Sequence, residues 1–256
     1  MSHRPRKHFG QNFLQSSSTI DAILKAIRPD SSDNLIEIGP GQGALTKPLL
    51  KHVDHLTVIE IDKDLHPIIQ ALPGASDKLT LIDADALKID YARFGHDLKV
   101  VGNLPYNIST PLIIQLLHHA EHIQDMIFML QKEVVERLVA TPGSKDFGRL
   151  SVMVQYYCQT EMLFTVPPEV FYPKPKVDSA VVRLTPYENS PYPDMDFQLL
   201  EDVVRQAFSM RRKTLANNLK KWMTAADIES LHIDPRWRPE QISVKDYVQI
   251  AKFITK

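Results

Sequence analysis

The fold of this chain follows from one stretch, Asn34-Leu35-Ile36-Glu37-Ile38-Gly39-Pro40-Gly41-Gln42-Gly43. Its first half is a short, mostly apolar run, which predicts a buried β-strand. Three glycines follow, in front of a helical pattern at 44–51. Glycine at such a strand-to-helix turn lets the backbone approach a ligand closely. We therefore expect a ligand-binding loop inside an α/β fold.

Strand and helix patterns alternate on both sides of this loop. Apolar runs predict strands at 34–38, 55–61, 78–82, 98–102 and 125–130. Helical spacing predicts one helix from the Ser16–Ser18 cap to Pro29, and others at 44–51, 64–72, 111–119 and 132–139. Such alternation is typical of βαβ units and predicts a Rossmann-like, mostly parallel sheet. The stretches 161–166 and 177–184 predict an antiparallel pair at its edge.

A proline-rich segment at 187–196 interrupts this pattern and predicts a linker. No strand pattern resumes after it, and the apolar spacing becomes helical. Residues 197–256 are therefore predicted to form a small all-helical domain. Before the linker we expect an α/β domain over 16–186 and a basic N-terminal arm over 1–15.

Composition is that of a soluble globular protein, because 43% of the 256 residues are hydrophobic and 24% are charged. No apolar run is long enough to span a bilayer, and the basic N-terminus lacks the apolar segment of a secretory signal. Cys158 is the only cysteine, which excludes an intramolecular disulfide and favours a reducing compartment. We therefore expect a cytoplasmic protein.

Positive charge is concentrated in two segments although the net charge is −1. Neither 1–20 nor 203–226 contains an acidic residue. Clustered cations on a nearly neutral protein favour a polyanionic partner. One cluster alone is also typical of a solvated helix face, but two of them favour nucleic acid. The candidate nucleic-acid-binding residues are Arg4, Arg6, Lys7, Arg211, Arg212, Lys213, Lys220 and Lys221.

Two acidic positions extend the glycine loop into a predicted adenosine site. Glu60 ends the second predicted strand, twenty-one residues after Gly39, where a carboxylate can accept hydrogen bonds from both ribose hydroxyls. Asp85 follows the third strand, where a carboxylate can meet the exocyclic amine of adenine. On these elements NAD stays open. The Gly-x-Gly-x-Gly spacing is one residue shorter than the dinucleotide fingerprint and favours S-adenosylmethionine.

The turn Asn103-Leu104-Pro105-Tyr106 follows the predicted strand 98–102. Open α/β sheets place their chemistry at the carboxyl ends of their parallel strands. This turn combines an amide, a constrained carbonyl and an aromatic face, which together suit a planar amino group. The alternative is an ordinary structural turn, since Asn and Pro are frequent turn formers. Beside an adenosine site, the turn also favours S-adenosylmethionine as the cofactor.

Five motifs in this order resemble the ribosomal RNA adenine N6,N6-dimethyltransferase family, and within it the bacterial small-subunit branch. They are His8-Phe9-Gly10-Gln11-Asn12-Phe13-Leu14, Glu37–Gly43, Asn103–Tyr106, Gln131-Lys132-Glu133-Val134 and Phe171–Ser179. The helical segment Phe208–Leu215 also matches, so the resemblance covers nearly the whole chain. It implies a class I methyltransferase sheet, S-adenosylmethionine as methyl donor and S-adenosylhomocysteine as product.

The resemblance also implies which residues form the site. The implied S-adenosylmethionine site comprises Asn12, Leu14, Gly39, Gly41, Glu60, Ile61, Asp85, Ala86 and Asn103. The implied acceptor site comprises Asn103, Leu104, Pro105, Tyr106 and Phe171. Tyr106 and Phe171 are expected to stack on the two faces of the adenine. For Phe171 the alternative is a core aromatic beside Pro173 and Pro175.

The implied reaction is dimethylation of N6 of two adjacent adenosines in the 3′-terminal hairpin loop of small-subunit ribosomal RNA. The implied partner is an immature 30S particle, with the enzyme acting as a monomer and contributing to subunit biogenesis. Two alternatives stay open: the large-subunit adenine methyltransferase of macrolide resistance, and a non-catalytic ribosome-assembly factor.

No metal is expected, because His118 and His122 lack a third ligand and are predicted to be exposed.

Overall fold

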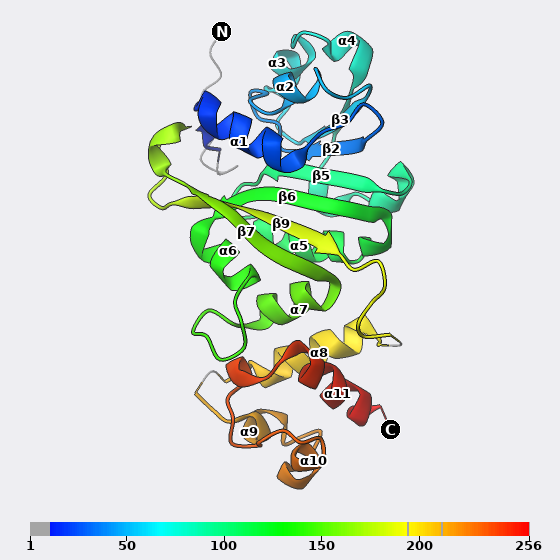
Figure 1. Ribbon diagram of the computed structural model, residues 1–256, viewed down its shortest axis with the longest axis vertical. Coiled ribbons are helices and arrows are strands. Elements are labelled where there is room, and N and C mark those ends of the chain that lie inside the picture. Colours follow the sequence, from blue (N-terminus) through cyan, green and yellow to red (C-terminus); the bar gives the residue numbers. More distant parts are fainter. Residues whose placement is uncertain (1–10, 194, 211, 256) are drawn as a thin grey trace. The chain divides into compact units, whose positions relative to one another are not determined.

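The computed structural model describes residues 11–193, 195–210 and 212–255 (Figure 1). They form two compact units. The first contains the chain up to Val135 together with Gln159–Pro186, and the second contains Glu136–Cys158 together with the chain from Tyr187 onward. Among the described residues, no helix has the length and apolar character needed to cross a membrane.

A seven-stranded sheet forms the centre of the first unit. Its strand order is β4-β3-β2-β5-β6-β9-β7 (Figure 1). The strands are β2 (Asn34–Ile38), β3 (Leu56–Glu60), β4 (Leu79–Asp83), β5 (Leu98–Asn103), β6 (Ile123–Gln131), β7 (Cys158–Val166) and β9 (Ser179–Pro186). The first five pair in parallel, and β9 pairs antiparallel with β6. These pairings confirm the predicted α/β fold with a mostly parallel sheet.

As predicted, the segments 161–166 and 177–184 lie together at one edge of the sheet, where β9 and β7 are its last two strands. β9 is the neighbour of β6, and β7 is the edge strand. Burial explains the order, because β9 is almost continuously buried whereas β7 exposes Gln159, Glu161, Met162 and Thr165. The more apolar strand therefore occupies the interior position.

Helix α1 (Ser17–Ile27) begins at the predicted cap, since the Thr19 N–H donates to Ser16 Oγ at 3.3 Å. Two other helices are shorter than the patterns at 44–51 and 64–72. α2 (Thr46–Leu49) contains Pro48, and α3 (His66–Gln70) is followed by Pro73 and Gly74. Proline supplies no backbone N–H, and Gly74 adopts φ 86, so neither segment continues as a regular helix. The remaining helices before residue 140 are α4 (Ala75–Lys78), α5 (Ser109–Leu117) and α6 (Lys132–Leu138).

The core of the first unit is centred on β2 and β3. Parallel strands covered on both faces carry continuous buried runs, and every residue of β3 is buried. Two members of these strands are nevertheless charged: Glu37 is 2% exposed and Glu60 is 6% exposed. Buried carboxylates are costly, so their presence marks this end of the sheet as a functional region.

The second unit is helical, as predicted for 197–256, but the predicted domain boundaries miss a part of it. Residues Glu136–Cys158, expected in the α/β domain, belong to the helical unit. Its helices are α7 (Arg149–Tyr157), α8 (Phe197–Ala207), α9 (Leu215–Leu219), α10 (Ala225–Ser230) and α11 (Val244–Ile254). α7 packs against α8 and α11, and Tyr156 stacks on Tyr192 with ring centroids 5.5 Å apart. The segment predicted as a linker is therefore packed against this unit.

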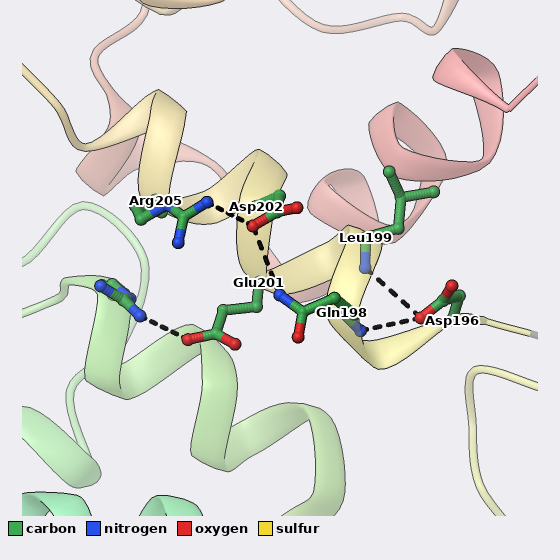
Figure 2. A network of polar contacts seen from close by, with 7 residues as sticks. Asp196, Gln198, Leu199, Glu201, Asp202 and Arg205 are labelled. Atoms are coloured by element: carbon green, nitrogen blue, oxygen red, sulfur yellow. Dashed lines mark hydrogen bonds and ion pairs between the residues drawn. The ribbon is translucent and has the colours of Figure 1, made fainter.

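Polar contacts fix the start of α8 and join it to α7 (Figure 2). The Asp196 carboxylate caps α8 by accepting from the Gln198 N–H at 2.8 Å and the Leu199 N–H at 3.4 Å. Glu201 of α8 forms an ion pair with Arg149 at the start of α7. This pair helps to explain why the segment before Cys158 groups with the C-terminal helices.

We predict that Gly102 of β5 tolerates no side chain. A Cβ atom there would lie 2.5 Å from the Ile38 carbonyl oxygen of β2 and 3.0 Å from Leu104 Cδ2. Overpacking of this kind costs about 1–3 kcal/mol. Gly102→Ala should therefore lower the unfolding free energy by this amount in chemical denaturation. The control is Gly148→Ala, whose new methyl group meets nothing within 4 Å. An equal loss of stability in both variants would contradict the prediction.

Candidate active site

A cavity of about 750 Å³ lies at the carboxyl ends of the parallel strands β2, β3 and β5. Its walls are the loops after these strands and after β4, together with Gln11–Leu14 and Phe171. Every residue predicted for the cofactor site and for the acceptor site lines it. These residues are Asn12, Leu14, Gly39, Gly41, Glu60, Ile61, Asp85, Ala86, Asn103, Leu104, Pro105, Tyr106 and Phe171. One cavity therefore joins the two predicted subsites.

The glycine loop lines this cavity with backbone because side chains do not fit there. Gly41 has φ 58, and a Cβ atom on it would lie 3.1 Å from the Phe13 ring. Gly43 has φ 83, and its Cβ would lie 2.6 Å from Leu72 Cδ1. The Gly39 N–H donates to the Ile59 carbonyl at 2.9 Å and so ties the loop to the end of β3. Left-handed backbone and close contacts both require glycine.

Backbone N–H groups hold the Glu60 carboxylate at the end of β3. The Asp62 N–H donates to Glu60 Oε1 at 2.9 Å, and the Gly41 N–H donates to Oε2 at 3.4 Å. Burial raises the pKa of Glu60, while these two hydrogen bonds oppose the rise. The glycine loop and the acidic residue thus form one hydrogen-bonded unit, which can present a carboxylate to a ribose.

Two loops contribute one acidic and one apolar wall, with Asp85 after β4 and Ile61 after β3. Asp85 Oδ1 accepts from the Leu87 N–H at 3.0 Å and caps the 3₁₀ helix Ala86–Lys88. Ile61 lines the same cavity although its side chain is 46% exposed. A fixed carboxylate near an open apolar surface can bind a base through its exocyclic amine and its face.

Asn103 is the last residue of β5, and its side chain is oriented by the N-terminal segment. Asn103 Nδ2 donates to the Asn12 carbonyl at 3.1 Å. Because a carbonyl only accepts, the nitrogen of the amide must face Asn12. Oδ1 therefore faces away from Asn12 as a hydrogen-bond acceptor. This orientation is what the recognition of an amino group requires.

The rest of the turn is held by its own hydrogen bonds. The Pro105 carbonyl accepts from the Ile108 N–H at 3.2 Å, and its second lone pair remains for another donor. The Tyr106 hydroxyl lies 3.3 Å from Ser179 Oγ at the start of β9. The turn is therefore anchored both to α5 and to the strand that follows the Phe171 loop.

Phe171 is brought to the cavity by a short strand pair. β8 (Phe171–Tyr172) pairs antiparallel with β1 (Phe13–Leu14), and Leu14 lies opposite Phe171. The Phe171 side chain is 5% exposed, so it packs in the core and also lines the cavity. The two alternatives considered for this residue are thus compatible.

A family model described as ribosomal RNA adenine dimethylase matches residues 2–256 of this chain. The chain belongs to this family. Two relatives are both named Ribosomal RNA small subunit methyltransferase A. The relative from Legionella pneumophila (strain Corby) is 60% identical over 255 residues, covering 100% of each chain. The relative from Pseudomonas aeruginosa is 56% identical over 252 residues, covering 97% of this chain and 94% of the other.

Solved structures have the same fold as this dimethylase family member. A dimethyladenosine transferase from Plasmodium falciparum superposes with a TM-score of 0.81 at 28% identity, covering 93% of this chain and 95% of the other. The 23S rRNA methyltransferase ErmE superposes with a TM-score of 0.76 at 22% identity, covering 96% and 100%, and shows the fold alone.

Family membership confirms the predicted activity. The chain is an adenine dimethylase of ribosomal RNA. Of the two adenosine cofactors that the sequence left open, it uses S-adenosylmethionine as methyl donor and not NAD.

A residue that sequence reasoning did not assign supports this cofactor. Glu37 lines the cavity, and its buried Oε2 has no hydrogen-bond partner among the described residues. Burial raises the pKa of Glu37 to about 7, a hydrogen bond with the Thr46 side chain opposes the rise, and the nearby charge of Glu60 adds to it. A buried carboxylate with an unpartnered oxygen in a cavity wall fits a cationic ligand, and S-adenosylmethionine carries a sulfonium and an ammonium group. The sequence signal was the position of Glu37, two residues before the first glycine of the loop.

Among the candidate RNA-binding residues that the structure describes, none lines this cavity. Arg212, Lys213, Lys220 and Lys221 are exposed in the second unit, around α9. Arg4, Arg6, Lys7 and Arg211 lie outside the described residues. The interpretation of these cations as an RNA-binding surface stays a prediction.

The two histidines considered as metal ligands differ in their exposure to solvent. His118 is exposed, as predicted. His122 is half-buried, contrary to expectation, because its Nδ1 lies 3.1 Å from the Gly95 carbonyl and its ring contacts the His96 ring in a tilted arrangement, with centroids 4.6 Å apart.

The raised pKa of Glu37 predicts a pH-dependent stability. A pKa of about 7 in the fold, against an ordinary value of 4.5, means that folding favours the neutral acid. This contribution is fully present below pH 4.5 and is lost as the pH rises through 7. The protonation of Glu37 contributes about 3 kcal/mol to the unfolding free energy at low pH.

Glu37→Gln should therefore remove the loss of stability that accompanies a rise in pH in the cofactor-free protein. Relative to the variant, the parent protein should lose about 3 kcal/mol of unfolding free energy between pH 4.5 and pH 8. Chemical denaturation at both pH values measures the difference. If the unfolding free energies of the two proteins change with pH in the same way, Glu37 ionises in the folded protein without a loss of stability, and the prediction is wrong.

Proposed function

We propose that this dimethylase acts on N6 of two adjacent adenosines in the 3′-terminal hairpin loop of small-subunit ribosomal RNA, within an immature 30S particle. The observation that carries the mechanism is the single cavity that joins the glycine loop and its acidic residues to the Asn103 turn. The choice of the small subunit is supported by the relatives at 60% and 56% identity, both named for that subunit. We further infer a monomeric cytoplasmic enzyme with a role in subunit biogenesis.

The first task of the site is to hold a weak nucleophile. The lone pair of adenine N6 is delocalised into the ring, which reduces its reactivity. Hydrogen bonds from N6 to Asn103 Oδ1 and to the Pro105 carbonyl would draw the nitrogen toward tetrahedral geometry and localise the lone pair. The Asn12 carbonyl, by binding Nδ2, keeps Oδ1 available for this contact. Tyr106 and Phe171 would hold the base between their rings.

The second task is to stabilise the charge that develops on N6. When bound, S-adenosylmethionine supplies an electrophilic methyl group on sulfur. As N6 becomes positive, the carbonyl dipoles of Asn103 and Pro105 interact with it more strongly than with the neutral amine. No general base is required, because N6 becomes acidic once methylated. For the second methylation, the monomethylated amine must rotate within the same pocket.

The third task is to bring the adenosine out of its stack. A base inside a helix or a stacked loop cannot reach a cavity of this kind, so it must be flipped out. Cations on the second unit would bind phosphates and RNA shape without reading bases. We infer that Arg212, Lys213, Lys220 and Lys221, with Arg4, Arg6, Lys7 and Arg211, supply this contact.

Two other functions were considered. A large-subunit methyltransferase has the same fold, as the ErmE structure shows. The relatives at 52–60% identity are named for the small subunit, which favours that target. A non-catalytic assembly factor is disfavoured because the glycine loop, Glu60 and the Asn103 turn all line one cavity. Binding to immature subunits is compatible with catalysis.

We predict that Asn103→Ala reduces methyl transfer by about 10²–10³-fold, as expected when a hydrogen-bond acceptor for the developing charge is lost. Transfer from labelled S-adenosylmethionine to undermethylated 30S particles measures this effect, with the modified nucleosides mapped. Binding of the cofactor and of the particle should remain measurable. Near-native transfer by the variant would refute the proposed role of the turn.

The basic residues of the second unit generate a separate prediction. Replacing Arg212 and Lys213 by Gln should weaken particle binding and make its salt dependence less steep. Two lost phosphate contacts lower the slope of log K against log salt by about 1.4–1.8. The control removes two exposed lysines of the same unit, Lys145→Gln and Lys245→Gln. If both double variants behave alike, these two cations do not form a specific RNA contact.

A further inference from the structure

One short segment contacts three parts of the active-site cavity. This segment, the N-terminal strap, comprises Gln11–Leu14, and all of its residues line the cavity. The Phe13 ring lies 3.1 Å from the position that a Cβ on Gly41 would take, and Leu14 pairs with Phe171. Asn12 accepts the hydrogen bond that orients Asn103. The strap therefore touches the glycine loop, the acceptor amide and the acceptor aromatic.

The first residue of the strap is tied to the acidic side of the cavity. Gln11 Nε2 donates to Asp62 Oδ2 at 2.8 Å. The Asp62 carboxylate is itself held in place, because its Oδ1 accepts from the Asp64 N–H at 3.2 Å and the residue is 1% exposed. The Asp62 N–H donates to Glu60, the predicted ribose acid. One chain of hydrogen bonds thus joins Gln11 to Glu60.

The opposite end of the strap is anchored by strand pairing. Phe13 and Leu14 form β1, which pairs with Tyr172 and Phe171 of β8. Asn12 lies between this pairing and the Gln11–Asp62 hydrogen bond. Its carbonyl is positioned from both sides by these two attachments. Releasing Gln11 would free the peptide unit that orients the Asn103 amide.

We propose that Gln11 and Asp62 are positioning residues for methyl transfer. Their hydrogen bond closes the strap over the cofactor side of the cavity and, through the Asn12 carbonyl, holds Asn103 Oδ1 toward the acceptor base. The strap therefore couples cofactor binding to assembly of the acceptor site. This inference rests on the proposed role of Asn103, and the first two measurements below do not require RNA.

The donor and acceptor of this hydrogen bond can be exchanged, which gives a sharp test. Gln11→Glu places two carboxylates against each other and breaks the bond. The double variant Gln11→Glu, Asp62→Asn restores it, because the new amide at 62 donates to the new carboxylate at 11. The amide oxygen at 62 still accepts from the Asp64 N–H, and the net charge equals that of the parent. Gln15→Glu is the control, since Gln15 is exposed and adds the same charge just beyond the strap.

Three measurements compare the parent, Gln11→Glu, the double variant and Gln15→Glu. In the cofactor-free protein, amide hydrogen exchange of a peptide covering 11–16 should be faster in Gln11→Glu. Calorimetry should show S-adenosylmethionine binding about tenfold weaker, the effect expected for loss of a hydrogen bond to a charged group. Steady-state transfer should show kcat about tenfold lower with KM for the RNA within twofold of the parent. The double variant should recover all three to within about threefold.

The outcomes separate the explanations. If Gln11→Glu matches Gln15→Glu in exchange and in cofactor affinity, the proposal is overturned. It is also overturned if the double variant stays as impaired as Gln11→Glu, or if a lower thermal stability is the only change. If the parent fails to methylate 30S particles, the proposed target is wrong, whereas exchange and calorimetry still decide whether the strap closes through Gln11 and Asp62.

Discussion

The active-site cavity depends on the parallel alignment of β2, β3, β4 and β5, because parallel strands bring their carboxyl ends to one edge of the sheet. Glu37, Glu60 and Asn103 come from three different strands, yet all line one cavity. The alignment requires close approach of β2 and β5, and Gly102 permits it next to the Ile38 carbonyl. The residue after Gly102 is Asn103, so the same contact places the acceptor amide.

Negative charge is concentrated at the edge of the sheet where the parallel strands end. Glu37, Glu60 and Asp62 are all buried, and burial raises the pKa of the first two. Backbone N–H groups stabilise Glu60, and the Gln11 amide stabilises Asp62, but Glu37 retains an unpartnered oxygen. Such groups destabilise the free protein and favour a cationic ligand. The proposed cofactor site would thus favour a sulfonium cofactor at some cost in stability.

Local patterns predicted most of the fold because strands and helix caps depend on neighbouring residues. The five parallel strands and the Ser16 cap follow from apolar runs and one hydroxyl. Helix lengths failed at 44–51, where Pro48 interrupts the pattern, and at 64–72, which Pro73 and Gly74 follow directly. Which strand of the edge pair takes the inner position could not be predicted, since strand order depends on competition between distant segments for burial. The grouping of Glu136–Cys158 with the helical unit depends likewise on contacts such as that of Arg149 with Glu201.

For the site, the sequence alone determined the chemistry, because residue types and spacing in the glycine loop, at Glu60 and in the Asn103 turn are local and characteristic of the family. It did not reveal Glu37 as a buried carboxylate with an unpartnered oxygen or Gln11 as the partner of Asp62. Only the tertiary structure decided these features. Burial and a hydrogen bond between residues 51 positions apart arise when distant segments pack together, and no local pattern encodes them. The same holds for the amide of Asn103, which the sequence supplies and the carbonyl of Asn12 orients.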